Sequence, residues 1–500
     1  MLNSGQWQFE LLTAAVVAIL QLLSIIHILI SKHANPAQSV FWLLLVTLLP
    51  GVGLLGYLFL GITRYEHVRS KVIRMRKVLS GDSRHLNSPS PWAEINRSLA
   101  AFQLTGAQAN TPRMIMLDRL FPEHPALTGN QLEKLEDGIA AYPRMLADIK
   151  NARSTVRLQS YILNSDEIGQ MFMTALAERA AAGVDVKILF DSVGSFKSYF
   201  SQYFRKELRQ NRKNFRIKAF SPVNLLAPWK FQLRNHRKLL VIDGQIAYVG
   251  GINISAGNIR SRRLPPSQYI HDLHCRITGP AVSQLSLSFL TDYLYSCRSS
   301  QRHNALHSGD CTLPVRTGKS VVRVLPGGPG NTREATRKLF FAAAALAQKE
   351  LWLQTPYFVP GRDYVNALCM AAARGVDVRI VVPAEGNHFY MTWAAQNFFD
   401  QLHEAGVKIY EKLGYFAHTK ALLVDSEWGF MGSSNCDSRS FYLNFELDFC
   451  FEGDSFTSEM VRQFQQEFSG SRKLTQHRLS STPEARKLLN SIAALFTPIL

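Results

Sequence analysis

The chain has 500 residues, of which 46% are hydrophobic and 19% are charged, with a formal net charge of +18. A chain of this length and hydrophobic content can form two good-sized cores and an additional segment. Its six cysteines are scattered without a close pair or a CxxC motif, which argues against a disulfide framework or a zinc site and fits a reducing compartment.

The N-terminal region contains two apolar segments, residues 11–30 and 40–62. Each is long enough to cross the hydrocarbon core of a bilayer as a helix, and a kink is expected at Pro50 in the second. A cleaved signal peptide is an alternative for the first segment, but a basic n-region and a small-residue cleavage site are missing. We therefore predict two transmembrane helices within residues 1–65 of an integral membrane protein.

The charges that flank the two segments predict the orientation in the membrane. The intervening loop has Lys32, whereas six basic residues follow the second segment: Arg64, Arg69, Lys71, Arg74, Arg76 and Lys77. The positive-inside rule places that flank, both termini and the large C-terminal part in the cytoplasm. Beside two membrane spans, the positive net charge favours anionic lipid over nucleic acid as the partner.

Residues 66–120 are predicted to form a basic juxtamembrane segment and linker. The stretch that begins near residue 80 is polar, rich in serine and contains proline, which is typical of a partly flexible connection. Packing of residues 80–120 on the catalytic core remains the alternative, and the first repeat is expected to begin at residue 121.

The first motif is "NHRKLLVIDGQIAYVGGIN", residues 235–253. His236 and Lys238 fall on one face of a predicted strand, because side chains two residues apart share a face. The following Asp-Gly pair predicts a hairpin turn, so Asp243 points away from His236. The Gly-Gly pair before Asn253 would let the backbone approach a ligand. An imidazole, an ammonium and an amide could converge on an anion, although solvated edge residues are an alternative for this segment taken alone.

A second motif, "HTKALLVDSEWGFMGSSN" at residues 418–435, repeats the first. His418 and Lys420 again share a strand face, Asp425 again falls at the turn, and Asn435 occupies the place of the earlier asparagine. Two full matches of this kind are not a chance event.

The duplication extends beyond the motifs. "ALAERAAAGVDVKILF" at 175–190 parallels "ALCMAAARGVDVRIVV" at 367–382, and "VRLQSYIL" at 156–163 parallels "LWLQTPYF" at 351–358. Strands that alternate with helices predict an α/β fold in which a mixed sheet is flanked by helices. We expect two repeats that pack about a pseudo-two-fold axis and bring both His-Lys faces to one shared site. Their predicted bounds are residues 121–309 and 310–500.

The second repeat is expected to end in an amphipathic helix within residues 484–500. Leu488, Ile492 and Leu495 lie at helical spacing there. Docking on the protein core and docking on the membrane both remain open for this helix.

Two histidines and two lysines at one place favour an anion site over a metal site, because ammonium groups would repel a cation and no carboxylate shares the His face. Phosphoryl transfer suits these groups: one neutral imidazole attacks phosphorus, and the other, protonated, gives a proton to the departing alcohol. No metal and no nucleotide cofactor is expected.

A nucleophilic imidazole needs its other ring nitrogen held, normally by a carboxylate. Asp272 in "YIHDLHCRITGP" and Glu446 in "SRSFYLNFELDF" are the candidates, since each lies downstream of a motif among apolar residues that would bury it. An ordinary structural ion pair is the alternative.

The paired "HRKLLVID" and "HTKALLVD" resemble the double HxKxxxxD signature of the phospholipase D superfamily. "RITGPAV", "TPYFVPG" and "SRSFYLNFE", behind two hydrophobic segments, make the chain most similar to the bacterial cardiolipin synthases of that superfamily. The resemblance covers nearly all of the chain and implies two phospholipase D-like repeats in a bacterial inner-membrane protein.

The resemblance also implies a role for each site residue. His236 is expected to be the nucleophile, and His418 the general acid and then base. Lys238, Asn253, Lys420 and Asn435 would bind the phosphate. Across the pseudo-dyad, Glu446 would orient His236, and Asp272 would orient His418. Asp243 and Asp425 complete the catalytic signature but look structural.

Two departures from the family pattern concern the site. Ile270-His271-Asp272 stands where many relatives have Trp-Arg-Asp, which bears on the lipid-facing loop and the choice of acceptor. In the second motif, Thr419 replaces a commoner alanine and Cys436 an apolar residue, and neither change removes a catalytic group.

The implied activity is transfer of a phosphatidyl group between two phosphatidylglycerol molecules to give cardiolipin and glycerol, through a phosphohistidine. A phospholipase D that uses water, or a transferase with another acceptor, would use the same residues. A superfamily nuclease and a non-enzymatic polybasic membrane tether are further alternatives, and the two apolar segments argue against the nuclease.

Overall fold

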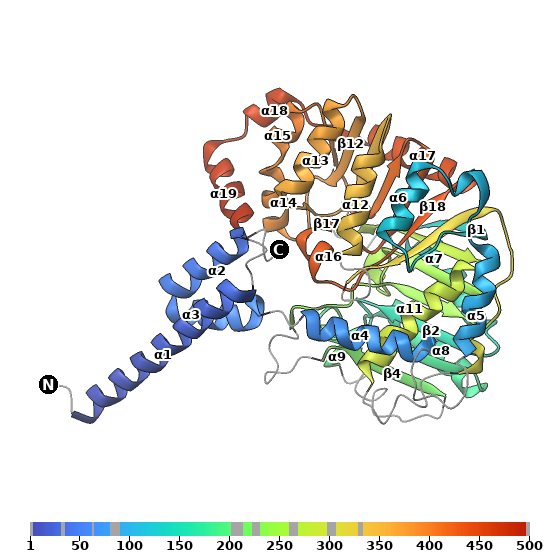
Figure 1. Ribbon diagram of the computed structural model, residues 1–500, viewed down its shortest axis with the longest axis horizontal. Helices are drawn as coiled ribbons and strands as arrows, with labels where there is room; N and C mark the ends of the chain where they lie inside the picture. Colours follow the sequence, from blue (N-terminus) through green and yellow to red (C-terminus); the bar gives the residue numbers. More distant parts are fainter. Residues whose placement is uncertain are drawn as a thin grey trace.

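The computed structural model describes residues 4–31, 36–62, 65–80, 91–201, 214–222, 231–259, 269–297, 307–328 and 334–496. Three N-terminal helices project from one side of an α/β body (Figure 1). They are α1 (Ser4–Ser31), α2 (Pro36–Leu48) and α3 (Pro50–Gly56), and a π-helical turn, Tyr57–Gly61, follows them. In the described residues, α1 is long and apolar enough over Trp7–Ser31 to cross a membrane.

The second expected transmembrane helix, residues 40–62, is not a single helix. It is divided between α2 and α3 at Leu49, whose φ of −127° and ψ of 71° are not helical. Leu49 precedes Pro50, and a proline ring disfavours helical backbone in the residue before it and removes one helical N–H. The expected kink at Pro50 is therefore a break between two short apolar helices.

The described part of residues 66–120, predicted as a juxtamembrane segment and linker, is mostly helical. It forms α4 (Tyr65–Ser80), α5 (Pro91–Leu99) and α6 (Pro112–Leu120). α4 buries its apolar face, with Val68, Val72, Met75 and Leu79, in the same core as the central sheet. These four residues recur every three or four positions, which is the spacing of one helix face.

The described strands include one 15-stranded mixed sheet. The first repeat contributes β1 (Leu127–Glu136), β2 (Thr155–Ser160), β3 (Asp185–Asp191), β4 (Phe215–Phe220), β5 (Leu239–Ile242), β6 (Ile246–Gly250) and β8 (Leu273–Thr278). The second contributes β9 (Ser320–Pro326), β10 (Glu350–Gln354), β12 (Asp377–Pro383), β13 (Lys408–Lys412), β15 (Ala421–Val424), β16 (Trp428–Gly432), β18 (Leu447–Glu452) and β19 (Ser471–Lys473).

The strand order has a pseudo-two-fold arrangement. From the centre, one half runs β1-β8-β6-β5-β2-β3-β4, and the other runs β9-β18-β16-β15-β10-β12-β13 with β19 added at the edge. β1 and β9 pair in antiparallel orientation at the centre, as a two-fold axis between them requires. The predicted α/β fold of two related repeats is therefore confirmed.

Helices cover both faces of this sheet (Figure 1). On one face, α11 (Ala281–Ser296) and α17 (Asp454–Ser469), with α4 and α5, share one hydrophobic core with strands of both repeats. On the other face, α7 (Asp137–Lys150) and α8 (Glu167–Ala181) cover the first repeat. The second repeat is covered there by α12 (Ala335–Leu346), α13 (Arg362–Ala373), α14 (Phe389–Gln396) and α15 (Phe399–Glu404). The outlying helices are α9 (Phe196–Tyr199), α16 (Ser438–Tyr442), α18 (Gln476–Ser480) and α19 (Glu484–Leu495).

The two motif hairpins have the same turn. Asp243 and Gly244 have φ values of 52° and 63°, and Asp425 and Ser426 have values of 53° and 54°. Positive φ at both central residues defines a type I′ turn, whose twist matches that of the flanking strands. The carboxylate of Asp243 accepts the N–H groups of residues 153–155, and that of Asp425 accepts those of residues 348–350. Both aspartates thus fasten a hairpin to the start of a neighbouring strand.

Candidate functional site

Each motif histidine is placed by backbone contacts with the opposite repeat. The His236 N–H donates to the Phe445 carbonyl (2.9 Å), and the His418 N–H donates to the His271 carbonyl (2.8 Å). The second contact continues a short parallel ladder between β14 (Phe416–Ala417) and β7 (Ile270–His271). The chain just before each motif strand therefore crosses to the other repeat, and both histidines lie near the pseudo-dyad.

The two imidazoles pair with buried carboxylates in the same crossed manner. His236 Nδ1 lies 3.0 Å from Glu446 Oε2, and His418 Nδ1 lies 2.6 Å from Asp272 Oδ2. Glu446 and Asp272 are almost fully buried. Because an ionised carboxylate can only accept, these contacts favour the tautomer with the proton on Nδ1 and the lone pair on Nε2. At His236 the Ser433 carbonyl, 3.0 Å from Nδ1, is a second acceptor for that proton. Each ring thus has the tautomer that a nucleophile or a general base needs.

The surroundings of the two carboxylates differ. Glu446 accepts from the hydroxyls of Ser433 (2.5 Å) and Ser440 (2.9 Å) and from the Asn444 amide (3.3 Å). Asp272 accepts the Leu273 N–H (2.8 Å). Sequence analysis missed this hydroxyl cluster, although the serines occur in the two motif segments "GSSN" and "SRSF" that point to the family.

The two lysines are buried beside the imidazoles. Lys238 Nζ donates to the His236 carbonyl at 2.6 Å and lies 5.4 Å from the centre of the Tyr161 ring. The same Tyr161 ring meets the His236 ring edge to face at 4.8 Å. Lys420 Nζ donates to the His418 carbonyl and lies 3.4 Å from Asp272 Oδ2. Lys420 Nζ also lies 2.8 Å from His418 Nδ1. Two ammonium groups next to two imidazoles can bind the oxygens of a phosphate group.

The predicted asparagines lie directly after the return strands β6 and β16. Asn253 Oδ1 accepts the Ile162 N–H at 3.1 Å, next to Tyr161, which leaves its NH₂ group as a donor. Asn435 is buried, and its N–H donates to the Ser440 hydroxyl at 3.1 Å. Asp243 and Asp425 do not join this site, since their carboxylates are engaged at the hairpin turns.

The Gly250-Gly251 pair has a different purpose from the one we expected. A Cβ added at Gly251 would overlap the carboxylate of Asp272. The glycine therefore makes room for the group that holds His418, and not for a ligand. At the corresponding place in the second repeat, the Ser433 hydroxyl instead hydrogen-bonds to Glu446.

Burial sets the charge state of the site. Burial lowers the pKa of His236, against the attraction of Glu446, and lowers the pKa of Lys238 to about 7. Burial and the Lys420 ammonium lower the pKa of His418 to about 3. Although burial acts in the opposite direction, the basic neighbours hold the pKa of Glu446 below its usual value. At neutral pH both imidazoles are therefore uncharged while the orienting carboxylate is ionised.

The two motifs also share one electrostatic field. Lys238 interacts with the charges of Lys420 and Asp272, and His418 interacts with that of Lys238. An anion placed between these groups would offset the mutual repulsion of the two ammonium ions and favour their charged forms. The chemistry that this arrangement supports best is binding of a phosphodiester and attack on its phosphorus.

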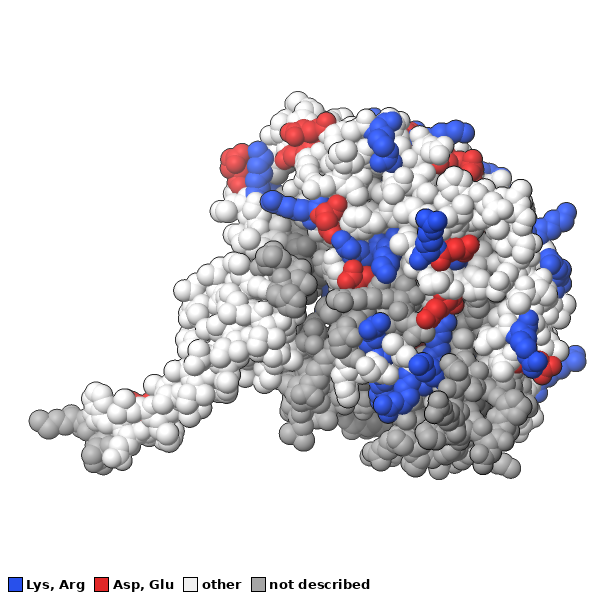
Figure 2. All heavy atoms as spheres, in the orientation of Figure 1, with Lys and Arg blue, Asp and Glu red and all other residues white. Residues whose placement is uncertain are grey.

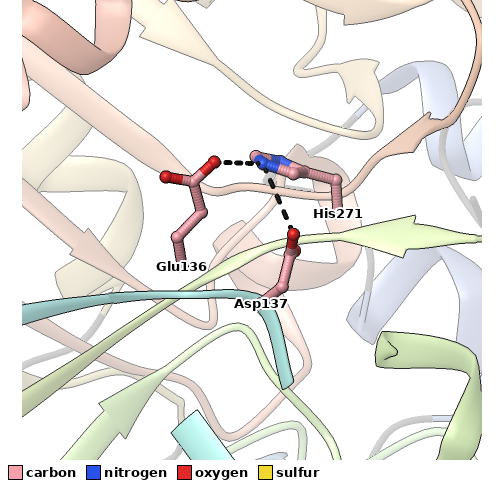
Figure 3. A group of neighbouring side chains, drawn as sticks. All are labelled: Glu136, Asp137 and His271. Carbon is pink, nitrogen blue, oxygen red and sulfur yellow. Dashed lines mark hydrogen bonds and ion pairs between the residues drawn. The ribbon is translucent and has the colours of Figure 1, made fainter. Parts of the chain in front are cut away.

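A second polar cluster, Glu136, Asp137 and His271, is shown in Figure 3 and contacts Asp272 through Asp137. Asp137 Oδ1 accepts the Asp272 N–H, and the Asp137 N–H donates to the Asp272 carbonyl, both at 2.9 Å. His271 Nε2 lies 3.0 Å from Glu136 Oε1 and 3.7 Å from Asp137 Oδ2. The three side chains are metal-ligand types, but the imidazole already pairs with both carboxylates, and Asp137 has a φ of 60° fixed by its two contacts with Asp272. We interpret the cluster as a support for the carboxylate that holds His418.

Comparison with known proteins identifies the family. The model of the cardiolipin synthase, phospholipase D-like domain matches residues 145–264 and 341–469, and a phospholipase D-nuclease N-terminal model matches 19–61. The chain is 33% identical to a cardiolipin synthase of Geobacillus kaustophilus, over 100% of this chain and 96% of the relative. It is 30% identical to cardiolipin synthase 1 of Staphylococcus epidermidis, over 96% and 95%.

A solved structure shares the fold. The phosphatidylserine synthase of Haemophilus influenzae matches with a TM-score of 0.58 and 17% identity, over 78% of this chain and 100% of that protein. The apolar helix α1, together with the sequence relatives, indicates a membrane protein. The full-length identity and the matched domain models establish that the chain belongs to the cardiolipin synthases of the phospholipase D superfamily, a family of phosphatidyltransferases.

Proposed function

We propose that this chain makes cardiolipin by moving a phosphatidyl group from one phosphatidylglycerol to the headgroup hydroxyl of a second. The observation that supports this most directly is the crossed pairing of His236 with Glu446 and of His418 with Asp272. It provides two oriented imidazoles with free Nε2 atoms beside two buried lysines, as a two-step displacement at phosphorus needs.

In the first step, His236 Nε2 attacks the phosphorus of the donor and forms an N–P bond. The P–O bond to the headgroup glycerol breaks, and His418 Nε2–H gives the glycerol oxygen its proton. In the second step, His418 removes the proton of the acceptor hydroxyl, whose oxygen attacks phosphorus and releases His236. Phosphorus passes from one alcohol to another, and the products are cardiolipin and glycerol.

The first step requires a protonated His418, whereas the pKa of this imidazole is lowered to about 3. We propose that the phosphodiester supplies the missing charge. Its anion would lie close to His418 and Lys420, and a neighbouring negative charge favours the imidazolium form. His418 would then take up a proton when the substrate binds. Without substrate, the imidazole would stay uncharged.

The proposal also assigns a role to each remaining site residue. Lys238, Lys420, Asn253 and Asn435 bind the phosphate oxygens, while Asp243 and Asp425 secure the hairpins. The proposed transfer uses these side chains without a metal ion. Closure of the site by lipid excludes water, since water as acceptor would yield phosphatidic acid.

We also propose that the protein is integral, with its catalytic part in the cytoplasm of a bacterial inner membrane. α1 would cross the bilayer. α2 and α3, broken at Pro50, fold back on each other, with the rings of Trp42 and Tyr57 5.3 Å apart, and would lie beside α1 in the apolar layer. The basic helix α4 follows, and the positive-inside rule assigns such a flank to the cytoplasm.

The test is lipid product analysis with labelled phosphatidylglycerol as the sole lipid, in the presence of a chelator, for the native chain and His236→Ala. Cardiolipin and free glycerol from the native chain alone are the expected result. Phosphatidic acid in place of cardiolipin would show that water is the acceptor. Equal turnover by His236→Ala would contradict the histidine mechanism, and binding of anionic vesicles without turnover by either chain would support a membrane tether.

A further inference from the structure

The C-terminal helix α19 presents its apolar side outward. Leu488 is 62% exposed, Ile492 44% and Leu495 67%, whereas Asn490 and Ala493 are buried. The helix is therefore amphipathic, as the sequence predicts, but it is docked the opposite way from an ordinary surface helix, whose apolar face covers the core.

Specific contacts fix this orientation. The Arg486 guanidinium lies 4.7 Å from the centre of the Trp393 ring of α14, and its Nε donates to Gln396 Oε1 at 3.4 Å. The Ser491 hydroxyl lies 3.3 Å from Asn397 Oδ1. The polar edge of α19 is thus the docked edge, and turning the helix over would break these contacts.

The outward face is continuous with the apolar N-terminal helices. Phe496, which follows α19, meets Phe41 of α2 edge to face at 5.8 Å, and Figure 1 shows α19 beside α2. On α2, Leu44 and Leu48 are exposed, and on α14 so is Phe389. Figure 2 shows almost no charged side chain over α1 to α3, in contrast to the α/β body.

We infer that the apolar face of α19 lies in the interfacial layer of the membrane that holds α1. We define the α19 surface as Leu488, Leu489, Ile492 and Leu495 with Phe389 of α14. A partner that covers this surface must also accommodate the exposed leucines of α2, and a bilayer does both. A second copy of the chain would have to match both surfaces at once.

This inference rests on the proposed function only in that the substrates are lipids. It adds a second attachment of the catalytic body to the membrane, on the second repeat, beyond the N-terminal helices. With two attachments the body cannot rotate freely about α3, and its orientation relative to the lipid surface is fixed.

The test measures lipid contact directly. In a full-length Cys311→Ser, Cys369→Ser background, an environment-sensitive fluorophore is attached at Leu488→Cys or Leu495→Cys, and the protein is placed in phosphatidylglycerol nanodiscs with brominated acyl chains. Met370→Cys on α13 is the matched control, because Met370 is also an apolar side chain that is 62% exposed. We expect strong quenching at 488 and 495 and little at 370.

Equal quenching at all three positions, or none, would overturn the inference. So would energy transfer between labels on two chains at 488 without quenching, which would identify a second copy as the partner. The Leu488→Glu, Leu495→Glu double variant should fold normally, since both side chains are exposed, and should lose quenching reported from position 492 (Ile492→Cys). Its cardiolipin formation in bilayers should fall by about tenfold relative to Met370→Glu.

Quenching of the fluorophore reports lipid contact and does not depend on catalytic turnover. A native chain that shows quenching but makes no cardiolipin would contradict the proposed function and leave this inference standing. A chain that makes cardiolipin without quenching at 488 and 495 would support the proposed function and contradict this inference.

Discussion

Nδ1 of His418, in the second repeat, lies 2.6 Å from Oδ2 of Asp272, in the first. The reciprocal pair, His236 with Glu446, is separated by 3.0 Å. Each repeat therefore holds a reactive imidazole and the carboxylate that orients the other imidazole. The two repeats are chemically interdependent, and changes at either carboxylate act on the histidine of the opposite repeat.

The roles of the two histidines can be separated with an activated donor. His418→Ala should lose turnover of phosphatidylglycerol, because the glycerol oxygen needs a proton to leave. With a phosphatidyl ester of p-nitrophenol, whose leaving group needs no proton, His418→Ala should still release one equivalent of nitrophenol and accumulate a phosphatidyl-enzyme. Acid-labile phosphate on a peptide that contains residue 236, detected by mass spectrometry, is the readout. A burst from His236→Ala, and none from His418→Ala, would reverse the assignment.

Glu446→Gln should lower kcat by roughly 100-fold to 10,000-fold, since a neutral amide no longer stabilises positive charge on the imidazole, and its NH₂ group can donate to Nδ1 in place of accepting from it. The same change should leave KM within about threefold, because Glu446 does not face the substrate in the proposed mechanism. Ser440→Ala, which removes one donor to Glu446, is the milder control and should cost about tenfold. An unchanged kcat in Glu446→Gln would show that the pair is an ordinary structural interaction.

Asp243, at the hairpin turn, should affect the free energy of unfolding and not the catalytic rate. Asp243→Ala leaves the N–H groups of residues 153–155 without their acceptor and puts alanine at a positive φ. We expect a loss of about 2–4 kcal/mol in the free energy of unfolding. Asp243→Asn keeps an acceptor oxygen and tolerates this backbone conformation, so its loss should be smaller than half of that. Activity per folded molecule, with the folded fraction measured by thermal unfolding, should match the native chain in both variants.

The pH dependence of kcat/KM should report the titration of Lys238. Its pKa is lowered to about 7, chiefly by burial, so the free protein loses this ammonium as the pH rises above 7. Phosphate binding in the proposed mechanism needs the charged form, and therefore kcat/KM should fall above about pH 7. Lys238→Arg keeps its charge and should move this fall to higher pH, at some cost in the maximal rate. An alkaline limb that is identical in the two proteins would assign it to another group.

The local structure of the motifs could be predicted only in part from the sequence. The turn at Asp243 follows from the Asp-Gly pair, whereas His236 and Lys238, expected on a strand, lie just before β5 (Leu239–Ile242). The pairing of each histidine with the carboxylate of the opposite repeat was predicted from the family resemblance. It depends on how residues distant in the chain meet at the pseudo-dyad, which no local pattern encodes.

Other features had a signal in the sequence that was not used or was interpreted differently. Val68, Val72, Met75 and Leu79 have the spacing of a buried helix face, but only the basic residues of this stretch entered the prediction, as a membrane flank. At Gly251 the need for a small residue was visible, whereas its cause, the carboxylate of Asp272, could be seen only in the structure. The inverted docking of α19 arises from its polar contacts with α14, which amphipathic periodicity does not reveal.

The shared hydrophobic core on one face of the sheet, which joins strands of both repeats, also bears on how the protein is made. A ribosome completes the first repeat before β9 and β18 exist, so the nascent chain then has His236 without Glu446 and an incomplete core. Larger chains generally fold domain by domain as they are synthesised, but the shared core of this chain can be completed only when the second repeat is present. A chain truncated after the first repeat would lack His418, Lys420 and Glu446, and we expect it to be inactive in the proposed phosphatidyl transfer.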